Sequence, residues 1–351
     1  MSFVGQSRVN TNATVFDGFA KSAQLEQDLL SRVQALDKDG HKIKIAAILF
    51  DEDTGSQLYS GLKQQAATRL GIEYDLFHYS LLDDPAQVAQ KISSISSQPE
   101  VIGLIVQKPW RQTWAKVLNK SDSLDLAAEY QTWWYSLVSR IDPNKDVDGL
   151  HPSTLAAIQD GTWWQRGRVL PATCKAVVTI LQDAGVMERG LMPATRMSGE
   201  EQNLVAKESG LFLKSHDFSS NFGPNKITIL GKSDLLGQPL FYLLSWLGFN
   251  VEMIGSKELN ERIEQKIYLH DSAVIVSATG RSGLITEEMV SEGVVLVDVG
   301  EPRADIDFAG CLKKARFITP VPGGVGPMTV ISLMENGVEL AEGQPSRTNL
   351  D

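Results

Sequence analysis

The sequence predicts an α/β protein of two domains, each built on a parallel sheet. Apolar runs of strand length alternate with amphipathic segments of helix length, which is the pattern of successive βα units. At 351 residues the chain is long for one core and comfortable for two domains. A nine-residue run at 321–329 contains three glycines and two prolines between a strand-like and a helix-like segment. Junctions of that kind are where α/β folds usually bind ligands.

The first domain is expected at residues 1–160, completed by residues 328–351. Its predicted elements are the buried strands Ile43–Phe50 and Val101–Val106 and the helix Leu58–Leu70 between them. Gly71 follows that helix and is a plausible residue to end it, because glycine readily adopts the left-handed conformation. The final helix, after Met328, is expected to pack back on this domain.

The second domain is expected at residues 161–327, as a Rossmann-like, doubly wound, NAD(P)-binding domain. Its predicted strands are Ile227–Leu230, Val251–Ile254, Ala273–Ser277, Val294–Val299 and Phe317–Thr319. Their spacing suits a nucleotide-binding sheet. Residues 110–139, with four tryptophans, and residues 188–225, rich in Gly, Ser, Glu and Lys, look like insertions. Long insertions form lids, interaction surfaces or disordered segments, and the sequence does not choose among these.

Composition restricts the class of function. Hydrophobic residues make up 42% and charged residues 22%, which is ordinary for a globular protein, and no apolar run reaches membrane-spanning length. A net charge of −10 argues against a nucleic-acid partner. Two cysteines and five scattered histidines give no disulfide framework and no metal-ligand spacing. The start of the chain lacks a secretory signal. We therefore expect a cytoplasmic protein that acts on a small molecule without a metal or a membrane.

Tyr59 and Lys63 are the first candidates for chemistry. They are four residues apart on a predicted helix, so their side chains share one face. Lysine shifts its pKa readily when buried, which suits it to acid/base work near neutral pH. Taken alone, the pair is more typical of a solvated lysine beside a half-buried tyrosine. Ser56 is the expected N-cap of this helix.

Polar residues follow the second predicted strand and occupy a later turn. Gln107 and Lys108 come directly after the strand, where side chains point into a ligand crevice, so Gln107 is expected to bond Lys63 or a ligand, or merely to cap the strand. Asp146 and Asp148 precede a glycine. Aspartates in such a turn satisfy their own backbone or accept hydrogen bonds from an amine-bearing heterocycle.

A glycine-bearing loop opens a helix after the first strand of the second domain. Gly231, Lys232, Ser233 and Gly237 lie in this loop, the usual arrangement for binding a phosphate at a helix N-terminus. After the next strand come Ser256 and Lys257, where NAD-binding domains carry an acidic residue, so NADP is favoured over NAD. Glu258 opposes that preference, and NAD remains the alternative cofactor.

These motifs, in this order, resemble the bifunctional methylenetetrahydrofolate dehydrogenase/methenyltetrahydrofolate cyclohydrolase family. The matching stretches are Ser56-Gln57-Leu58-Tyr59 with Lys63, Val106-Gln107, Lys145 to Pro152, Gly231-Lys232-Ser233 with Gly237 and Pro239, Ala278-Thr279-Gly280, Val297 to Gly300, and Pro320 to Thr329. The resemblance runs from about Asp17 to Ala341 and leaves the two insertions uncovered. It implies oxidation of methylenetetrahydrofolate with NADP, followed by hydrolysis to formyltetrahydrofolate, in a homodimer.

The resemblance also implies roles for individual residues. Lys63 looks like the catalytic lysine, with Tyr59 stacking on the folate and Gln107 tuning the lysine. Further folate contacts are implied for Val106, Lys108, Asp148, Pro322, Gly323, Gly324, Val325 and Gly326. Cofactor contacts are implied for Gly231, Lys232, Ser233, Gly237, Ser256, Ala278, Thr279, Gly280, Glu301 and Thr329.

The chain departs from the family pattern at several of these positions. The family usually has Leu-Pro-Leu-Pro after the glutamine, where this chain has Lys108-Pro109-Trp110-Arg111. Lys232 replaces the usual arginine, and Glu301 replaces an isoleucine near the cofactor. Two alternative functions stay open. One is a dehydrogenase with weak or absent cyclohydrolase activity, and the other is a non-catalytic folate- or nucleotide-binding protein.

Overall fold

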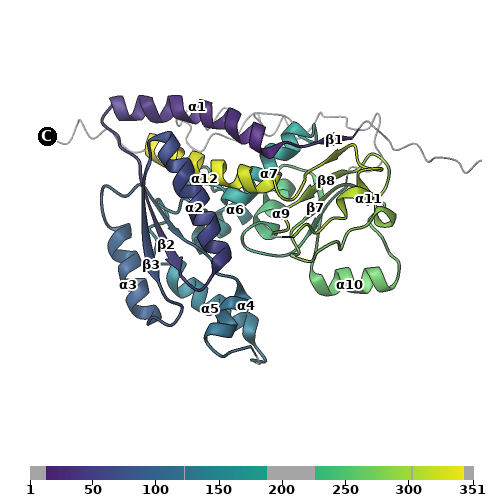
Figure 1. The fold of residues 1–351 in the computed structure, drawn as a ribbon, viewed down its shortest axis with the longest axis horizontal. Coiled ribbons are helices and arrows are strands. Elements are labelled where there is room, and N and C mark those ends of the chain that lie inside the picture. The colour runs from purple at the N-terminus through teal and green to yellow at the C-terminus, as the bar shows by residue number, and fades with distance from the viewer. Residues whose placement is uncertain (1–12, 122, 188–225, 302, 344–351) are drawn as a thin grey trace, which may run out of the picture. The chain divides into compact units, whose positions relative to one another are not determined.

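The computed structural model describes residues 13–343 except 122, 188–225 and 302 (Figure 1). Their contacts divide the chain into two compact units. Unit 2 holds Ser22–Lys175 and the chain from Thr329 onward, and unit 1 holds the remaining described residues. Unit 2, which holds most of the expected first domain, therefore runs to Lys175 and does not end near residue 160. The described residues before Ser22 belong to unit 1.

Unit 2 contains a three-stranded parallel sheet in the order β3-β2-β4. Its strands are β2 (Lys44–Phe50), β3 (Glu73–Tyr79) and β4 (Gly103–Val106). Its helices are α2 (Thr54–Leu70), α3 (Pro85–Ser96), α4 (Arg111–Val117), α5 (Leu126–Val138), α6 (Pro152–Gln159) and most of α1 (Gly18–Lys38) and α12 (Val325–Glu342). Strand β3 lies on one side of β2 and β4 on the other. The loops after β2 and β4 therefore meet at the carboxyl edge, where the strand order reverses.

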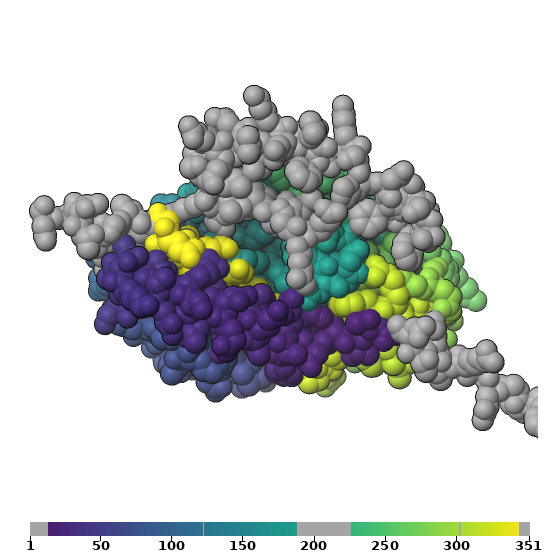
Figure 2. Space-filling model, turned by 90° about the horizontal axis from the view of Figure 1, so that it is seen from above, coloured from purple at the N-terminus to yellow at the C-terminus, as the bar shows by residue number. Residues whose placement is uncertain are grey.

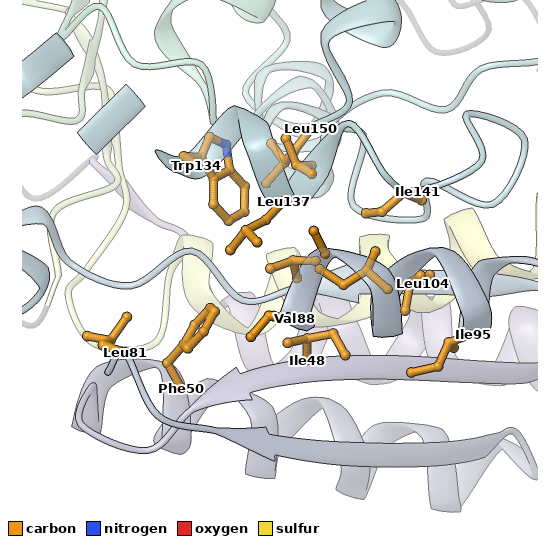
Figure 3. Packing of buried hydrophobic residues seen from close by; sticks show 14 of the residues in the cluster. Ile48, Phe50, Leu81, Val88, Ile95, Leu104, Trp134, Leu137, Ile141 and Leu150 are labelled. Carbon is orange, nitrogen blue, oxygen red and sulfur yellow. The ribbon is translucent and has the colours of Figure 1, made fainter. Parts of the chain in front are cut away.

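Alternate residues of the strands face opposite layers of unit 2. Ile48 and Phe50 of β2 and Leu104 of β4 point toward helices α3 and α5 (Figure 3). Trp114 and Trp134 are fully buried in the same hydrophobic cluster. The segment expected as an insertion thus folds as α4 and α5 and covers one face of the sheet. Its tryptophans supply core area, because burying an aromatic side chain contributes strongly to stability.

Helix α2 begins and ends at identifiable residues. Asp53 is its N-cap and accepts hydrogen bonds from the backbone N–H and the hydroxyl of Ser56. The expectation that Ser56 is the cap is wrong, because the helix starts earlier and the aspartate reaches its free N–H groups. Gly71 ends the helix with φ 75°, which confirms the predicted left-handed cap.

Helix α12 belongs to unit 2 from Thr329 onward, which confirms that the end of the chain returns to the first domain. The buried Asn336 amide donates to the carbonyls of Val147 (3.0 Å) and Leu170 (2.8 Å). The part of α1 that belongs to unit 2 runs along α12 (Figure 2). Arg32 of α1 pairs with Glu342 of α12 at 2.8 Å. These contacts fix α12 against the turn at Val147, the segment at Leu170 and helix α1.

Unit 1 contains a six-stranded parallel sheet in the order β1-β9-β8-β7-β5-β6. Its strands are β1 (Thr14–Val15), β5 (Lys226–Leu230), β6 (Asn250–Ile254), β7 (Ser272–Ser277), β8 (Val295–Asp298) and β9 (Phe317–Ile318). Its helices include α9 (Gly237–Trp246), α10 (Ser256–Glu264) and α11 (Phe308–Cys311), while α7 (Ala172–Asp183) crosses from unit 2 into unit 1. The strand order reverses between β5 and β7.

The predicted strands agree with the observed ones to within one or two residues. Two strands were not predicted. Strand β1 has only two residues, and β3 is only partly buried, so it lacks the apolar run that marks the others. The two-domain α/β class, with a doubly wound second domain, is confirmed.

Candidate active site

Lys63 lies at the centre of a polar cluster in unit 2. Its side chain is on the buried face of α2 and is only 5% exposed. The ammonium Nζ donates to Gln107 Oε1 at 3.3 Å and lies 3.9 Å from Asp148 Oδ2. Burial lowers the pKa of Lys63 and the charge of Asp148 partly opposes this. A buried amine with a lowered pKa can exchange a proton closer to neutral pH than a solvated lysine.

Gln107 and Asp148 reach Lys63 from the end of β4 and from a following turn. The Gln107 backbone N–H donates to Ile48 O at 2.9 Å and so continues the ladder one residue past the strand. Asp148 precedes Gly149, which has φ 72°. A Cβ at Gly149 would lie 2.5 Å from Pro171 N, so the close backbone contact that shapes this turn requires glycine.

The two aspartates of the turn have different surroundings. Asp146 is buried and accepts from the backbone N–H groups of Leu150 (3.1 Å) and His151 (2.9 Å) and from the Thr154 hydroxyl (2.8 Å). Burial raises the pKa of Asp146 to about 6, although these hydrogen bonds lower it. Asp146 therefore holds the turn, while Asp148 faces the lysine. The structure separates two roles that the sequence left open.

Several buried polar atoms of unit 2 have no hydrogen-bond partner among the described residues. Four of them are Tyr59 Oη, Ser60 Oγ, Tyr74 Oη and Gln107 Nε2, and the others are Nε1 of Trp114, Trp134 and Trp164 and Nε of Arg168. Tyr59, Ser60 and Lys63 come from one helix, and Tyr74 comes from β3. Sequence reasoning missed Ser60 and Tyr74. The i, i+3 spacing of Ser60 and Lys63 was a signal for the first, whereas Tyr74 lies on the strand that was not predicted.

Val106 and Lys108 flank Gln107, and their side chains point elsewhere. Val106 is part of the hydrophobic cluster that faces α3 and α5. The Lys108 ammonium lies over the Trp134 ring at 5.0 Å, a cation–π contact. Alternation at the end of the strand explains this, since neighbouring side chains leave opposite faces. The structure brings Gln107 to Lys63 but does not bring the side chains of Val106 and Lys108 there.

In unit 1 the loop after β5 is built for close backbone approach. Gly231 has φ 114°, and a Cβ there would lie 2.5 Å from Ala278 O, in the loop after β7. A Cβ at Gly237 would lie 2.0 Å from Gly231 O. Helix α9 starts at Gly237, and its N-cap residue Leu236 makes no side-chain hydrogen bond. Ser233 caps this start, since the Gly237 N–H reaches Ser233 Oγ at 3.5 Å and the Gln238 N–H donates to Ser233 O at 2.9 Å. The glycine loop thus folds closely against a helix N-terminus, the usual place for a phosphate.

Polar and charged side chains gather at the end of β6. The Lys232 side chain passes over Gly255, with its Cε 3.1 Å from the position a Cβ would occupy. The next residue, Ser256, begins α10. Lys232 Nζ lies 4.0 Å from Glu258 Oε2, and Arg262 also binds Glu258 at 2.9 Å. The structure therefore brings Lys232 to Ser256 and holds the opposing glutamate between two cations.

Asp305 fixes the loop that contains Ala278, Thr279 and Gly280. It is fully buried, and its carboxylate accepts from Ser277 Oγ (2.8 Å), Thr279 N (2.6 Å) and Arg281 N (2.8 Å). The Asp305 N–H in turn donates to Asp298 Oδ1 at 3.2 Å. Sequence reasoning missed Asp305. Glu301 follows β8 on the exposed surface of the same edge.

The 321–329 run connects β9 to α12, as predicted for a strand-to-helix junction. The helix starts at Val325, earlier than the expected start after Met328. Gly323 O accepts from Gly18 N at 2.9 Å, and a Cβ at Gly18 would lie 2.0 Å from Gly324 O. The exposed Pro322 follows a cis peptide bond, while Gly326 and Thr329 lie in the first turns of α12.

No group of three His, Cys, Asp or Glu side chains in the described ranges is arranged to hold a metal ion. In the same part of the chain, no helix is long and apolar enough to cross a membrane.

Two family sequence models match the chain in tandem. "Tetrahydrofolate dehydrogenase/cyclohydrolase, catalytic domain" matches residues 16–123, and "Tetrahydrofolate dehydrogenase/cyclohydrolase, NAD(P)-binding domain" matches residues 209–345. The chain belongs to the tetrahydrofolate dehydrogenase/cyclohydrolase family. The first match contains Tyr59, Lys63 and Gln107, and the second contains the Gly231 loop.

Relatives and solved structures agree with this family assignment. The chain is 29% identical over 337 residues to the bifunctional protein FolD of Dechloromonas aromatica, covering 94% of this chain and 98% of that protein. It is 29% identical over 340 residues to that of Lactobacillus acidophilus, covering 95% and 99%. The bifunctional FolD structure from Campylobacter jejuni is 27% identical, with a TM-score of 0.70 over 94% of this chain and 99% of that chain. The Trypanosoma brucei enzyme, solved with NADP and an inhibitor, shares the fold at 23% identity, with a TM-score of 0.71 over 94% and 97%.

Proposed function

We propose that this protein oxidises methylenetetrahydrofolate to methenyltetrahydrofolate with NADP and then hydrolyses the product to formyltetrahydrofolate. The observation that carries the proposal is the buried Lys63, held by Gln107 and Asp148 in the domain that matches the family's catalytic domain. A cofactor site of backbone amides and glycines in the other unit supports the oxidation step.

The hydrolysis step uses the lysine as an acid/base group. Addition of water to the methenyl carbon releases one proton, and an uncharged Lys63 amine accepts it. Burial favours that uncharged amine by lowering its pKa. The Gln107 carbonyl and the Asp148 carboxylate then stabilise the ammonium, so the lysine stays in place through the step. Asp148 is also our candidate for anchoring the amine-bearing pterin ring, since a carboxylate accepts two such hydrogen bonds.

Unit 1 has the residues expected to hold NADP. The amides at the start of α9 suit the pyrophosphate, and Lys232 and Ser256 suit a 2′-phosphate at the end of β6. The bound cofactor supplies the hydride acceptor, and the protein supplies orientation and charge. The remaining predicted contacts, Ala278 to Gly280, Glu301 and Thr329 for the cofactor and Pro322 to Gly326 with Tyr59 for the folate, are part of the proposal.

The test is a pair of steady-state assays with methylenetetrahydrofolate. Reduced cofactor should appear with NADP, and methenyltetrahydrofolate added alone should be hydrolysed. Oxidation without hydrolysis would favour a dehydrogenase that lacks the second activity. Absence of both would leave a folate- or nucleotide-binding protein.

Cofactor preference gives a sharper test. We expect kcat/KM to be higher with NADP than with NAD and the preference to shrink as ionic strength rises. Ser256→Asp should shift the ratio toward NAD by about tenfold or more, because it replaces a hydrogen bond to a charged phosphate with repulsion. Ser245→Asp, on the exposed side of α9, is the matched control. A wild type that prefers NAD, or an unchanged ratio in Ser256→Asp, would contradict the assignment.

We also propose that the protein is a cytoplasmic homodimer, as the family resemblance implies. Light scattering at assay concentration should give twice the mass of the 38.5 kDa chain. A monomeric mass with full activity would rule out the dimer as a requirement, and fractionation of its source cells tests the compartment.

A further inference from the structure

Tyr130 on helix α5 holds the chain just after Gln107, a contact that the proposed mechanism does not use. Its side chain is buried, and its hydroxyl donates a hydrogen bond to the carbonyl oxygen of Pro109, two residues past Gln107. Helix α5 begins at Leu126, whereas the match to the family's catalytic-domain model ends at residue 123. The contact is therefore made by a segment of this chain that the family model does not cover.

The ring of Tyr130 is fixed by aromatic neighbours on α4 and α5. It meets the Trp114 ring edge-on, with ring centroids 5.4 Å apart, and stacks with Trp133 at 5.8 Å. The Lys108 ammonium lies 5.8 Å from the centroid of the Tyr130 ring and 5.0 Å from that of Trp134. A ring packed in this way has little freedom to move. Its hydroxyl is therefore a fixed donor to the loop after β4.

The link from Pro109 back to Gln107 is stiff. Proline fixes its own φ, and it restricts the residue before it, here Lys108, to extended conformations. On its other side, the Gln107 N–H is held by Ile48 O at 2.9 Å. A fixed Pro109 carbonyl therefore sets the direction in which the chain leaves Gln107. It thereby holds the backbone from which the Gln107 amide reaches Lys63 Nζ at 3.3 Å.

We propose that Tyr130 is a positioning residue for the hydrolysis step, which keeps the Gln107 amide against Lys63 by anchoring the Pro109 carbonyl. The inference rests on the proposed function, in which that amide supports the lysine while its charge changes. Loss of the anchor should therefore reduce hydrolysis much more than oxidation. A general loosening of unit 2 would instead weaken folate binding and reduce both activities.

The experiment is Tyr130→Phe, which keeps the ring contacts and removes only the hydroxyl. We expect kcat for methenyltetrahydrofolate hydrolysis to fall roughly 3- to 10-fold, as for loss of one ordinary hydrogen bond, with KM and the oxidation rate little changed. Tyr79→Phe is the matched control. Tyr79 packs against the same hydrophobic cluster but lies on β3, which is separated from β4 by β2.

A second variant tests the stiff link without changing Tyr130. Pro109→Ala keeps the carbonyl that accepts the hydrogen bond but releases the fixed φ, so it should lower hydrolysis in the same selective way. Full hydrolysis in this variant would show that the anchor does not act through the backbone between Pro109 and Gln107, and would overturn the inference.

A double-mutant cycle tests whether Tyr130 acts through Gln107. In a Gln107→Met background, Tyr130→Phe should cause no further loss of hydrolysis. An unchanged kcat in the single variant, an equal loss of both activities, or the same loss in both backgrounds would overturn the inference while leaving the proposed function intact. A wild type that does not hydrolyse the substrate would overturn the proposed function and this inference with it.

Discussion

In unit 2 the strand order reverses between β2 and β4, and in unit 1 it reverses between β5 and β7. The two reversals differ in the groups that lie beside them. The reversal in unit 2 is followed by side chains, with Lys63, Gln107 and Asp148 converging in a buried cluster. The reversal in unit 1 is lined by backbone, with Gly231 against Ala278 and the start of α9 left without a side-chain cap from its N-cap residue.

The difference follows from what each site has to do. A proton-transferring group must be removed from water and held by specific partners, which requires side chains of the right chemistry. A phosphate is held well by N–H groups that the backbone already provides, and glycine lets that backbone approach closely. The same topology therefore carries the proposed reaction centre in one unit and the proposed phosphate site in the other.

One device is common to both units. Asp146 in unit 2 and Asp298 in unit 1 are buried carboxylates that accept hydrogen bonds from backbone N–H groups of the segments that follow them. Burial raises the pKa of each to about 6, against those hydrogen bonds. Each holds a loop of its proposed site through these backbone hydrogen bonds and is not itself a proposed ligand contact.

The variant with the largest expected effect should reduce hydrolysis far more than oxidation. Lys63→Met keeps the bulk of the side chain and removes the titrating group, so hydrolysis of methenyltetrahydrofolate should fall about 10²–10⁴-fold. Oxidation with NADP should be much less affected, because unit 1 is untouched. Lys91→Met, on exposed α3, is the control. Normal hydrolysis in Lys63→Met would remove the lysine from the mechanism.

The converse experiment disrupts the proposed phosphate-binding loop after β5 in unit 1. Gly231→Ala combines a positive φ with a Cβ 2.5 Å from Ala278 O and should cost roughly 2–5 kcal/mol of stability. Affinity for NADP should fall with it. Gly293→Ala also has a positive φ, 79°, but its Cβ would meet nothing within 4 Å, so only the cost of the positive φ applies. Thermal unfolding and NADP titration measure both, and equal losses in the two variants would argue against the close contact.

Asp148→Ala tests whether the two activities share one folate anchor. Losing a charge-assisted hydrogen bond to the pterin should weaken both activities by roughly 1.5–3 kcal/mol. Hydrolysis should suffer more, because Lys63 also loses the neighbour that supports its charge. Asp37→Ala, exposed on α1, is the control. Unchanged folate binding in calorimetry would rule out the anchor.

The smallest expected effect is the pH dependence due to Asp146 and Asp298. Their folded-state pKa values lie above the ordinary 3.8, so their contribution to stability is present below that value and is lost as pH rises through about 6. Between pH 5 and pH 7 each should lose on the order of 1 kcal/mol. Asp146→Asn and Asp298→Asn should each flatten the stability profile over that window, as measured by denaturant unfolding. A profile as steep as that of the wild type would mean that the carboxyl does not titrate there.

The sequence by itself determined the features that depend on neighbours along the chain. Apolar runs located the main strands, Gly71 marked the end of α2, and the four-residue spacing placed Tyr59 and Lys63 on one face. The position of Gln107 at a strand end gave a hydrogen bond to Lys63 as one of three alternatives, and the structure shows that bond at 3.3 Å. These predictions succeed because backbone conformation and side-chain direction are set locally.

Only the tertiary structure decided which side chains meet across the sheet. It placed Asp146 in the interior and Asp148 beside Lys63, although the two are a single residue apart. It turned Lys108 to Trp134 and buried the Tyr74 hydroxyl on a strand with no strong apolar pattern. Such contacts depend on strand register and helix packing between segments far apart in sequence. A shift of one residue in register would reverse the direction of every side chain on a strand, and no local pattern specifies it.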